Sequence, residues 1–209
     1  DQLMTGNGFT HNHTLSMSAG SERIRVMTSL GYLDQNGIIK NANFKRYNLR
    51  NNMDIRMNDR LNFRLDIAAT YSRRAANPYQ SSVFGFMNSK DPLMLAQWSD
   101  GSYAPFTGGT VNPLPMIEQG VGGNNIRQNG VLKASAALEY KPVQWLTLEV
   151  KAAPQLTAVK THRFVDLVEY HSDPYGTVSK TSNAEYNSLD ETVTAAWNGY
   201  YHATAAATR

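Results

Sequence analysis

Polar and apolar side chains alternate along residues 44–72, FKRYNLRNNMDIRMNDRLNFRLDIAATYS, with one interruption at Asn58-Asp59-Arg60. Successive residues of a β-strand point to opposite faces of a sheet, so this pattern predicts two strands joined by a tight turn. Before the turn, one face carries Tyr47, Leu49, Met53, Ile55 and Met57. After the turn, the matching face carries Leu61, Phe63, Leu65, Ile67, Ala69 and Tyr71. Each strand has about a dozen residues, whereas strands of soluble domains average about 5–6.

The same unit recurs along the chain. HTLSMSAG reaches a turn at Gly20-Ser21-Glu22 and continues as RIRVMTSLGYL. VLKASAALEY, residues 131–140, leads through a connection at residues 141–144 into a further strand over residues 145–160. Residues 189–209 have the pattern of one more strand. The chain is therefore predicted to be all-β, an antiparallel meander of about seven long strands.

The remaining connections are long and rich in Gly, Pro, Asn and Ser. We expect loops at about residues 75–126 and 162–188, and a shorter one at residues 33–43. Two stretches of the first loop, Val83–Asn88 and Pro92–Trp98, are predicted as short helices. Short turns at one end of every hairpin and long loops at the other are typical of outer-membrane β-barrels.

Composition excludes several other classes of protein. The 209 residues include 20 Lys and Arg against 17 Asp and Glu, and these charges are scattered, which argues against a nucleic-acid partner. Cysteine is absent, so disulfides, thiolate metal sites and cysteine nucleophiles are excluded. No apolar run is long enough for a transmembrane helix. The first residues, DQLMTGNGFT, lack a signal-peptide pattern, so we expect a processed chain or an internal piece of a longer one.

Catalytic motifs are missing. His11-Asn12-His13 places two imidazoles on one strand face, but no third ligand follows at a recognisable spacing, so a polar strand start is favoured over a metal site. Two acidic pairs could be taken for glycosidase carboxylates, but surface acids are the simpler interpretation: Glu169 with Asp173, and Asp190 with Glu191. The sequence predicts no enzyme, no metal and no cofactor.

The first long loop contains the best candidates for ligand contact. Trp98, Tyr103 and Phe106 lie near Asp100 in the sequence. Aromatic faces with polar neighbours bind sugars and peptides, so these four residues are the predicted substrate-binding set. The alternative is that they pack the loop against itself or against a partner protein.

Several motifs, in order, carry a resemblance to a known family. SLGYLDQNG (Ser29–Gly37) is followed by FKRYNLR (Phe44–Arg50), and both come after a strand with a charged turn, where Ala19-Gly20 replaces a usual Gly pair. DGSY, NPL and KPVQWLTLEV follow further along. This part of the chain, to about Thr161, resembles the early barrel region of SusC/RagA-type TonB-dependent transporters.

The resemblance implies a fold, a location and partners. Such proteins form barrels of about 22 strands that are plugged by a separate domain. They lie in the cell outer membrane and import glycans or oligopeptides with energy relayed by TonB. A SusD-like surface lipoprotein, the TonB system and outer-membrane lipid are therefore the implied partners. Residues 1–209 are expected to be a partial barrel region without the plug domain.

Two hypotheses remain for the two-faced strands. In a barrel, Arg46, Arg50, Arg56, Arg64 and Asp66 would line the water-facing wall, and the apolar alternates would face lipid. In a soluble all-β binding or structural domain, the apolar face would be covered by a second sheet. What covers that face decides between the two hypotheses.

Overall fold

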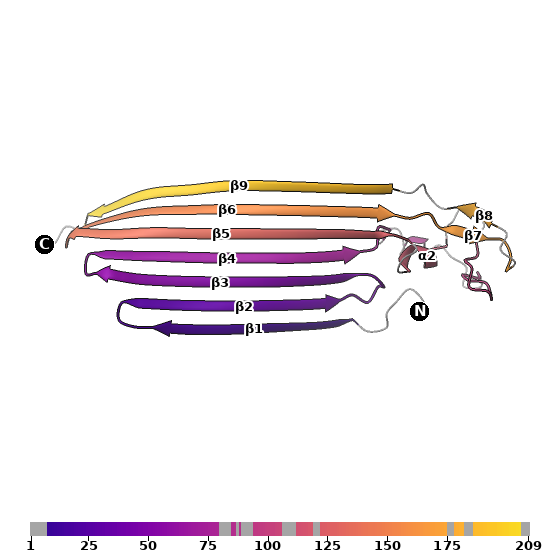
Figure 1. The fold of residues 1–209 in the computed structure, drawn as a ribbon, viewed down its shortest axis with the longest axis horizontal. Coiled ribbons are helices and arrows are strands. Elements are labelled where there is room, and N and C mark those ends of the chain that lie inside the picture. Colours follow the sequence, from indigo (N-terminus) through magenta and orange to yellow (C-terminus); the bar gives the residue numbers. More distant parts are fainter. Residues whose placement is uncertain are drawn as a thin grey trace.

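A computed structural model of the chain describes residues 8–79, 85, 86, 88, 94–105, 112–118, 122–174, 178–181 and 186–205. Seven long strands form one antiparallel sheet in the order β1-β2-β3-β4-β5-β6-β9 (Figure 1). The sheet is open, with β1 and β9 at its two edges. This confirms the predicted all-β meander of long strands.

The strands have 12 to 20 residues, as the sequence pattern predicts. Their bounds are β1 Phe9–Gly20, β2 Ile24–Asn36, β3 Asn43–Asn58, β4 Leu61–Ala76, β5 Asn124–Val143, β6 Leu146–Val165 and β9 Tyr186–Ala205. Three smaller elements lie beyond one end of the sheet: α2 Leu114–Ile117, β7 Glu169–His171 and β8 Val178–Thr181 (Figure 1). Among the described residues, no helix has the length and hydropathy that crossing a membrane requires.

Tight turns join the strands at the opposite end. The Asn58 side chain accepts a hydrogen bond from the backbone N–H of Arg60 at 2.9 Å, which fixes the turn between β3 and β4. The third hairpin differs from the prediction of a connection at residues 141–144. Strand β5 continues to Val143, and its register shifts between Tyr140 and Val143. Pro142 lies inside this irregularity, because a bulge accepts a residue that has no N–H to donate.

One of the two helices predicted in the first long loop is present among the described residues, and the other is not. Gly85, Phe86 and Asn88 are helical, whereas the described part of the second stretch, residues 94–98, is not. Gln97 instead forms an antiparallel bridge with Tyr103. Gly101, at φ 91°, sits at the tip of the turn between them, and a positive φ suits glycine. Residues 94–98 therefore lead into a tight turn and do not form the helix that their sequence predicts.

The cross-strand register gives the sheet two different faces. On the face called the apolar face below, one row crosses all seven strands through Leu15, Leu30, Leu49, Ala69, Leu132, Leu156 and Ala195. On the opposite face, called the polar face, the neighbouring row is Ser16, Ser29, Arg50, Ala68, Lys133, Gln155 and Ala196. The alternation seen in residues 44–72 thus extends across the whole sheet.

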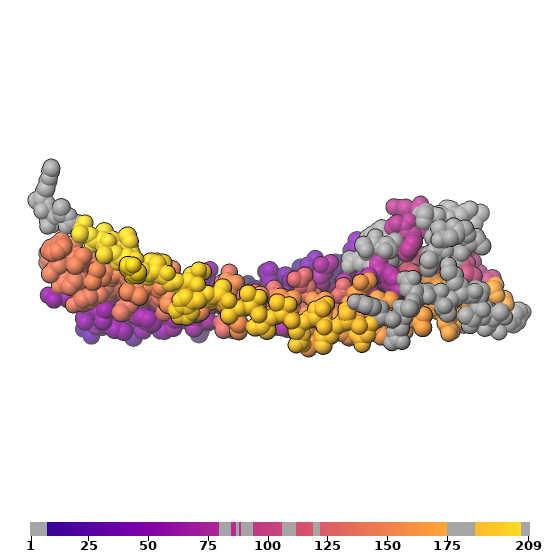
Figure 2. Space-filling model, turned by 90° about the horizontal axis from the view of Figure 1, so that it is seen from above, coloured from indigo at the N-terminus to yellow at the C-terminus, as the bar shows by residue number. Residues whose placement is uncertain are grey.

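The sheet is a single layer. In the described part of the chain no second sheet lies over either face, and Figure 2 shows a thin, bowed layer away from the loop end. Leu15 remains 67% exposed and Val193 70% exposed on the apolar face. The one hydrophobic cluster of the described residues lies at the loop end instead, formed by Tyr79, Met116, Ile117 and Val165 with Phe86 against it. A sandwich would need a second layer that the described residues do not supply.

The junction between loop and sheet depends on a glycine, which yields a prediction. Gly123 precedes β5 at φ 88°, and a Cβ there would collide with the Phe164 carbonyl oxygen. Gly123→Ala should therefore destabilise the full-length protein by about 1–3 kcal/mol in urea unfolding. Gly130→Ala is the matched control, since its Cβ would meet only the Ala158 carbonyl oxygen at 3.9 Å. Equal stability of the two variants would contradict this account.

Candidate functional site

The apolar face carries a band of defined height. Along β4 the band runs from Leu61 to Tyr71, which at about 3.3 Å per residue spans about 33 Å. A strand tilted by about 40° would cover about 25 Å of thickness, which is the height of the lipid-facing band of outer-membrane barrels. The dimensions of the apolar face therefore match a bilayer core.

Aromatic side chains border this band on the loop side. Tyr32, Tyr47 and Tyr71 form a row across β2, β3 and β4. Their ring centroids lie 5.0 and 6.3 Å apart in sequence order. Tyr140 and Trp145 lie at the other end of the band and are about half exposed. Two aromatic borders are typical of the two interfaces of a membrane barrel.

The row beyond the tyrosines is charged. On the apolar face this row consists of His11, Asp34, Lys45, Arg73, Gln128, Lys160 and Glu191. Lys45 pairs with Asp34 at 3.0 Å, and Lys160 pairs with Glu191. The change from leucine to tyrosine to charge within a few residues marks the edge of the apolar band.

The polar face holds all five residues that the sequence proposed for a water-facing wall. Arg46, Arg50 and Arg56 lie on β3, and Arg64 and Asp66 lie on β4. The register places their side chains on the same side of the sheet. Arg50 donates to the Asn52 side chain at 3.1 Å, and Asn52 in turn donates to Asp66.

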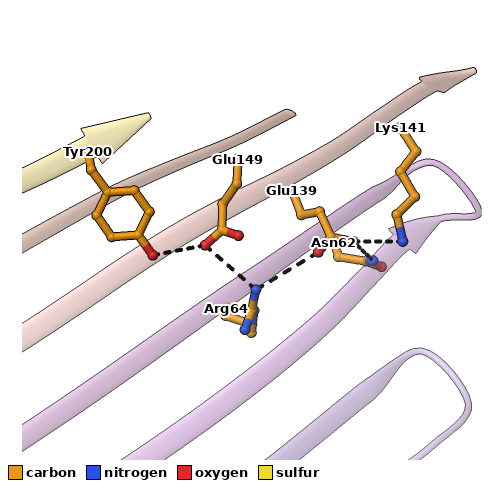
Figure 3. A network of polar contacts seen from close by, with 6 residues as sticks. All are labelled: Asn62, Arg64, Glu139, Lys141, Glu149 and Tyr200. Atoms are coloured by element: carbon orange, nitrogen blue, oxygen red, sulfur yellow. Dashed lines mark hydrogen bonds and ion pairs between the residues drawn. The ribbon is translucent and has the colours of Figure 1, made fainter. Parts of the chain in front are cut away.

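A charge network occupies the polar face near the tight turns (Figure 3). Glu139 on β5 and Glu149 on β6 are directly opposite each other, and like charges in that arrangement repel. Arg64 on β4 lies 3.9 Å from the first carboxylate and 3.8 Å from the second, so it bridges them. Lys141 pairs with Glu139 at 3.0 Å, and the Tyr200 hydroxyl donates to Glu149 at 3.3 Å.

The candidate substrate residues of the first long loop are tied into the loop itself. The Trp98 indole N–H donates to the His171 carbonyl at 2.8 Å, which links the two long loops. The Tyr103 hydroxyl donates to the Glu118 carboxylate. Burial, followed by this hydrogen bond, raises the pKa of Tyr103. Trp98 and Tyr103 thus lie in one folded unit, called the loop unit below, which comprises residues 94–105 and 112–118 together with His171. Phe106 falls outside the described residues.

Asp100 has a local structural role. Its carboxylate accepts hydrogen bonds from the Ser102 hydroxyl at 2.7 Å and the Ser102 backbone N–H at 2.9 Å. These bonds hold the pKa of Asp100 below its ordinary value. Their contribution to loop stability is therefore complete above the ordinary carboxyl pKa of about 3.9 and is lost as pH falls through the lowered pKa.

Asn112 is the central residue of the loop unit, a role that its position in the sequence did not reveal. Its side chain is fully buried and donates to the carbonyls of Ala96 at 2.6 Å and Ala104 at 2.9 Å. The same amide accepts from the Leu114 N–H at 3.1 Å. The signal that could have identified it is Asn-Pro directly before an apolar run, since Asn side chains bond the backbone two residues ahead.

Comparison with known proteins agrees with the barrel-like features of the sheet. No protein-family model matches the chain. TonB-dependent receptor P26 of Formosa agariphila is 26% identical over 166 residues, which cover 78% of this chain and 16% of that protein. TonB-dependent receptor P39 of the same organism is 29% identical over 164 residues, which cover 75% of this chain and 14% of that protein. The chain therefore spans about a sixth or less of these relatives.

Solved structures share the fold. A structure of the RagAB peptide importer in the closed-closed state gives a TM-score of 0.57 at 18% identity, over 95% of this chain and 26% of the matched one. A structure of the same importer in the open-open state gives a TM-score of 0.58 at 17% identity, over 92% of this chain and 21% of the matched one.

The open sheet with its two different faces has the fold of a section of the wall of a large β-barrel. Within the class of large β-barrels, the chain has partial homology to the TonB-dependent receptors, and its open sheet matches part of their barrel. These receptors are outer-membrane proteins and transporters rather than enzymes. The expected fold, family resemblance and location are thereby confirmed.

The loop unit gives one prediction. Asn112→Ala removes the donor from two carbonyl groups at a buried site, and each unsatisfied group costs about 1–3 kcal/mol. We expect faster hydrogen exchange of residues 94–105 in the full-length protein. Gln97→Ala is the control, because its amide makes one exposed bond to the Gly101 carbonyl at 2.7 Å. Unchanged exchange in Asn112→Ala would contradict the central role of this side chain.

The charge network gives another prediction. Arg64→Met leaves the opposed carboxylates of Glu139 and Glu149 without their bridge, which should cost about 0.2–1 kcal/mol in urea unfolding of the full-length protein. Adding Glu149→Gln should restore most of that loss, since one of the two like charges is removed. A double variant no more stable than Arg64→Met would show that repulsion is not the cause.

Proposed function

We propose that this chain forms a section of barrel wall in a TonB-dependent outer-membrane importer of nutrients such as glycans or oligopeptides. The apolar face lies toward lipid, and the polar face lies toward a water-filled lumen. The loops at about residues 75–126 and 162–188 lie outside the cell, and the tight turns lie on the periplasmic side. Seven strands in an open sheet supply wall and loops, while the rest of the barrel and the plug close the lumen.

The observation that carries this proposal is the uncovered apolar face. Leaving apolar surface in water costs about 25 cal/mol per Å², so a continuous band of this height requires a cover. An arginine at the centre of a bilayer costs about 2–4 kcal/mol, and the polar face carries one on several strands. Both magnitudes favour the same orientation, with lipid on the apolar face and water on the other.

The loop unit is the proposed contact surface for substrate and for a SusD-like surface lipoprotein. Trp98 and Tyr103 are partly buried, and their polar ends are already bonded within the loop. Their rings are therefore held in fixed positions and present apolar surface at the exposed end of the wall, beside Asp100. The matched structures are of a peptide importer made of two components, which supports a peptide substrate and a lipoprotein partner for the parent protein.

Neighbouring residues on opposite faces test the orientation. Leu132 and Lys133 are both exposed in the isolated sheet, so lipid alone should distinguish them. In the full-length protein in proteoliposomes, Lys133→Cys should react with a water-soluble maleimide, and Leu132→Cys should be protected by at least about tenfold.

Unfolding in urea provides the internal control, because both cysteines should then react alike. The opposite pattern, with Leu132→Cys reactive and Lys133→Cys protected, would reverse the faces. Equal reactivity in proteoliposomes would contradict a membrane wall and favour a soluble domain.

A further inference from the structure

Two arginines lie directly opposite each other on the polar face, close to the loop end. Arg74 on β4 pairs in register with Arg127 on β5. Like charges in directly opposed positions of adjacent strands destabilise a sheet. Both side chains are exposed to solvent on this face, and Arg163 of β6 adds a third guanidinium one row closer to the loops.

The opposed glutamates at the other end of the same face provide a comparison within the molecule. Glu139 and Glu149 are bridged by Arg64, so their repulsion is offset by a group of the chain itself. Within the described residues, no carboxylate lies within ion-pair distance of Arg74 or Arg127. Their neighbours in the row are Phe44 on β3 and Thr161 on β6, and the nearest acid of the row, Asp190, is a further strand away.

A hollow lies where the two arginines meet. Its volume is about 480 Å³, and its lining includes Arg74, Arg127, Asn125 and Thr161, with the end of β4 as its wall. The polar side chains of these four residues offer two guanidinium groups, one amide and one hydroxyl. No acidic side chain of the described residues lines it. Guanidinium groups bind carboxylates and sulfates through two parallel hydrogen bonds, which are stronger than bonds between neutral groups.

We propose that Arg74 and Arg127 bind an oxyanion group of the transported substrate, a carboxylate or a sulfate ester, at the outer mouth of the lumen. This inference rests on the proposed function, because the polar face must line the lumen. It adds the substrate class: the nutrient is anionic. The bound anion supplies the negative charge that the chain does not, as Arg64 supplies the positive charge between the two glutamates.

The proposed anion site and the lipid-facing surface lie on opposite faces of the sheet. Arg73 is adjacent in sequence but lies on the apolar face, in the charged row beyond the tyrosines. Arg74 lies on the opposite face and cannot reach the same headgroups. Arg73→Gln is therefore a matched control that removes the same charge from the same strand.

Sulfate is the probe for the first test. In the full-length protein in detergent, sodium sulfate should raise the Tm relative to sodium chloride at equal ionic strength. Arg74→Gln and Arg127→Gln should each weaken the apparent sulfate affinity by about tenfold or more, the effect of one charge-assisted hydrogen bond. Without sulfate, neither variant should be less stable than the wild type, because each removes a repelling charge. Arg73→Gln should keep the wild-type response.

Paired ligands then identify the source of the anion. An acidic oligopeptide is compared with its amidated form, and a sulfated oligosaccharide with its desulfated form, in binding to wild type and to Arg74→Gln. If the wild type prefers one of the charged ligands and Arg74→Gln does not, the proposal is supported. The preferred ligand then shows whether the anion comes from a peptide or from a sulfated glycan. A sulfate response that is absent, or equal in the wild type and all three variants, would overturn it. That outcome leaves the proposed function standing if the maleimide pattern at residues 132 and 133 is as expected.

Discussion

The hydrogen-bond register across seven strands is the constraint on which both faces depend. Because side chains alternate with a period of two, a slip of one residue in any pair would move leucines to the polar face and arginines to the apolar face. The turns prevent such a slip: Asn58 fixes one hairpin through its own side chain, and the irregularity at Pro142 absorbs extra residues before the third turn. The register therefore keeps apolar side chains on one face of the sheet and polar side chains on the other.

Much of this wall could be predicted from the sequence. Long alternating runs specify strand, partner and face together, so the meander and the shared face of Arg46 and Arg64 followed directly from the pattern. The loop unit could not be predicted in this way. The Asn112 side chain donates to the Ala96 and Ala104 carbonyls, and the Asn112 carbonyl accepts from the Tyr170 hydroxyl, 58 residues further along the chain. Local propensity also failed at residues 94–98, where one glycine turn decided the backbone path.

Charge on the polar face is arranged differently at its two ends. Near the tight turns, carboxylates and cations alternate between strands, and the network in Figure 3 is closed within the chain. Toward the loops, arginines of β4, β5 and β6 gather with few acids among them. Such an arrangement produces a positive potential at one end of the wall and a nearly balanced one at the other, and a field of this kind concentrates anions where the loops begin.

Asn77 belongs to both the hollow and the loop unit. It lines the hollow beside Arg74 and is 3% exposed, and its side chain donates to the Met116 carbonyl of α2. Asn41, from the β2–β3 connection, holds the adjacent Ile117 carbonyl at 2.6 Å. The rim is thereby fixed to the sheet by one buried and one partly buried hydrogen bond. A ligand that enters meets a rim whose backbone is already held in place, so the conformational entropy lost on binding is confined largely to exposed side chains such as Arg74 and Arg127.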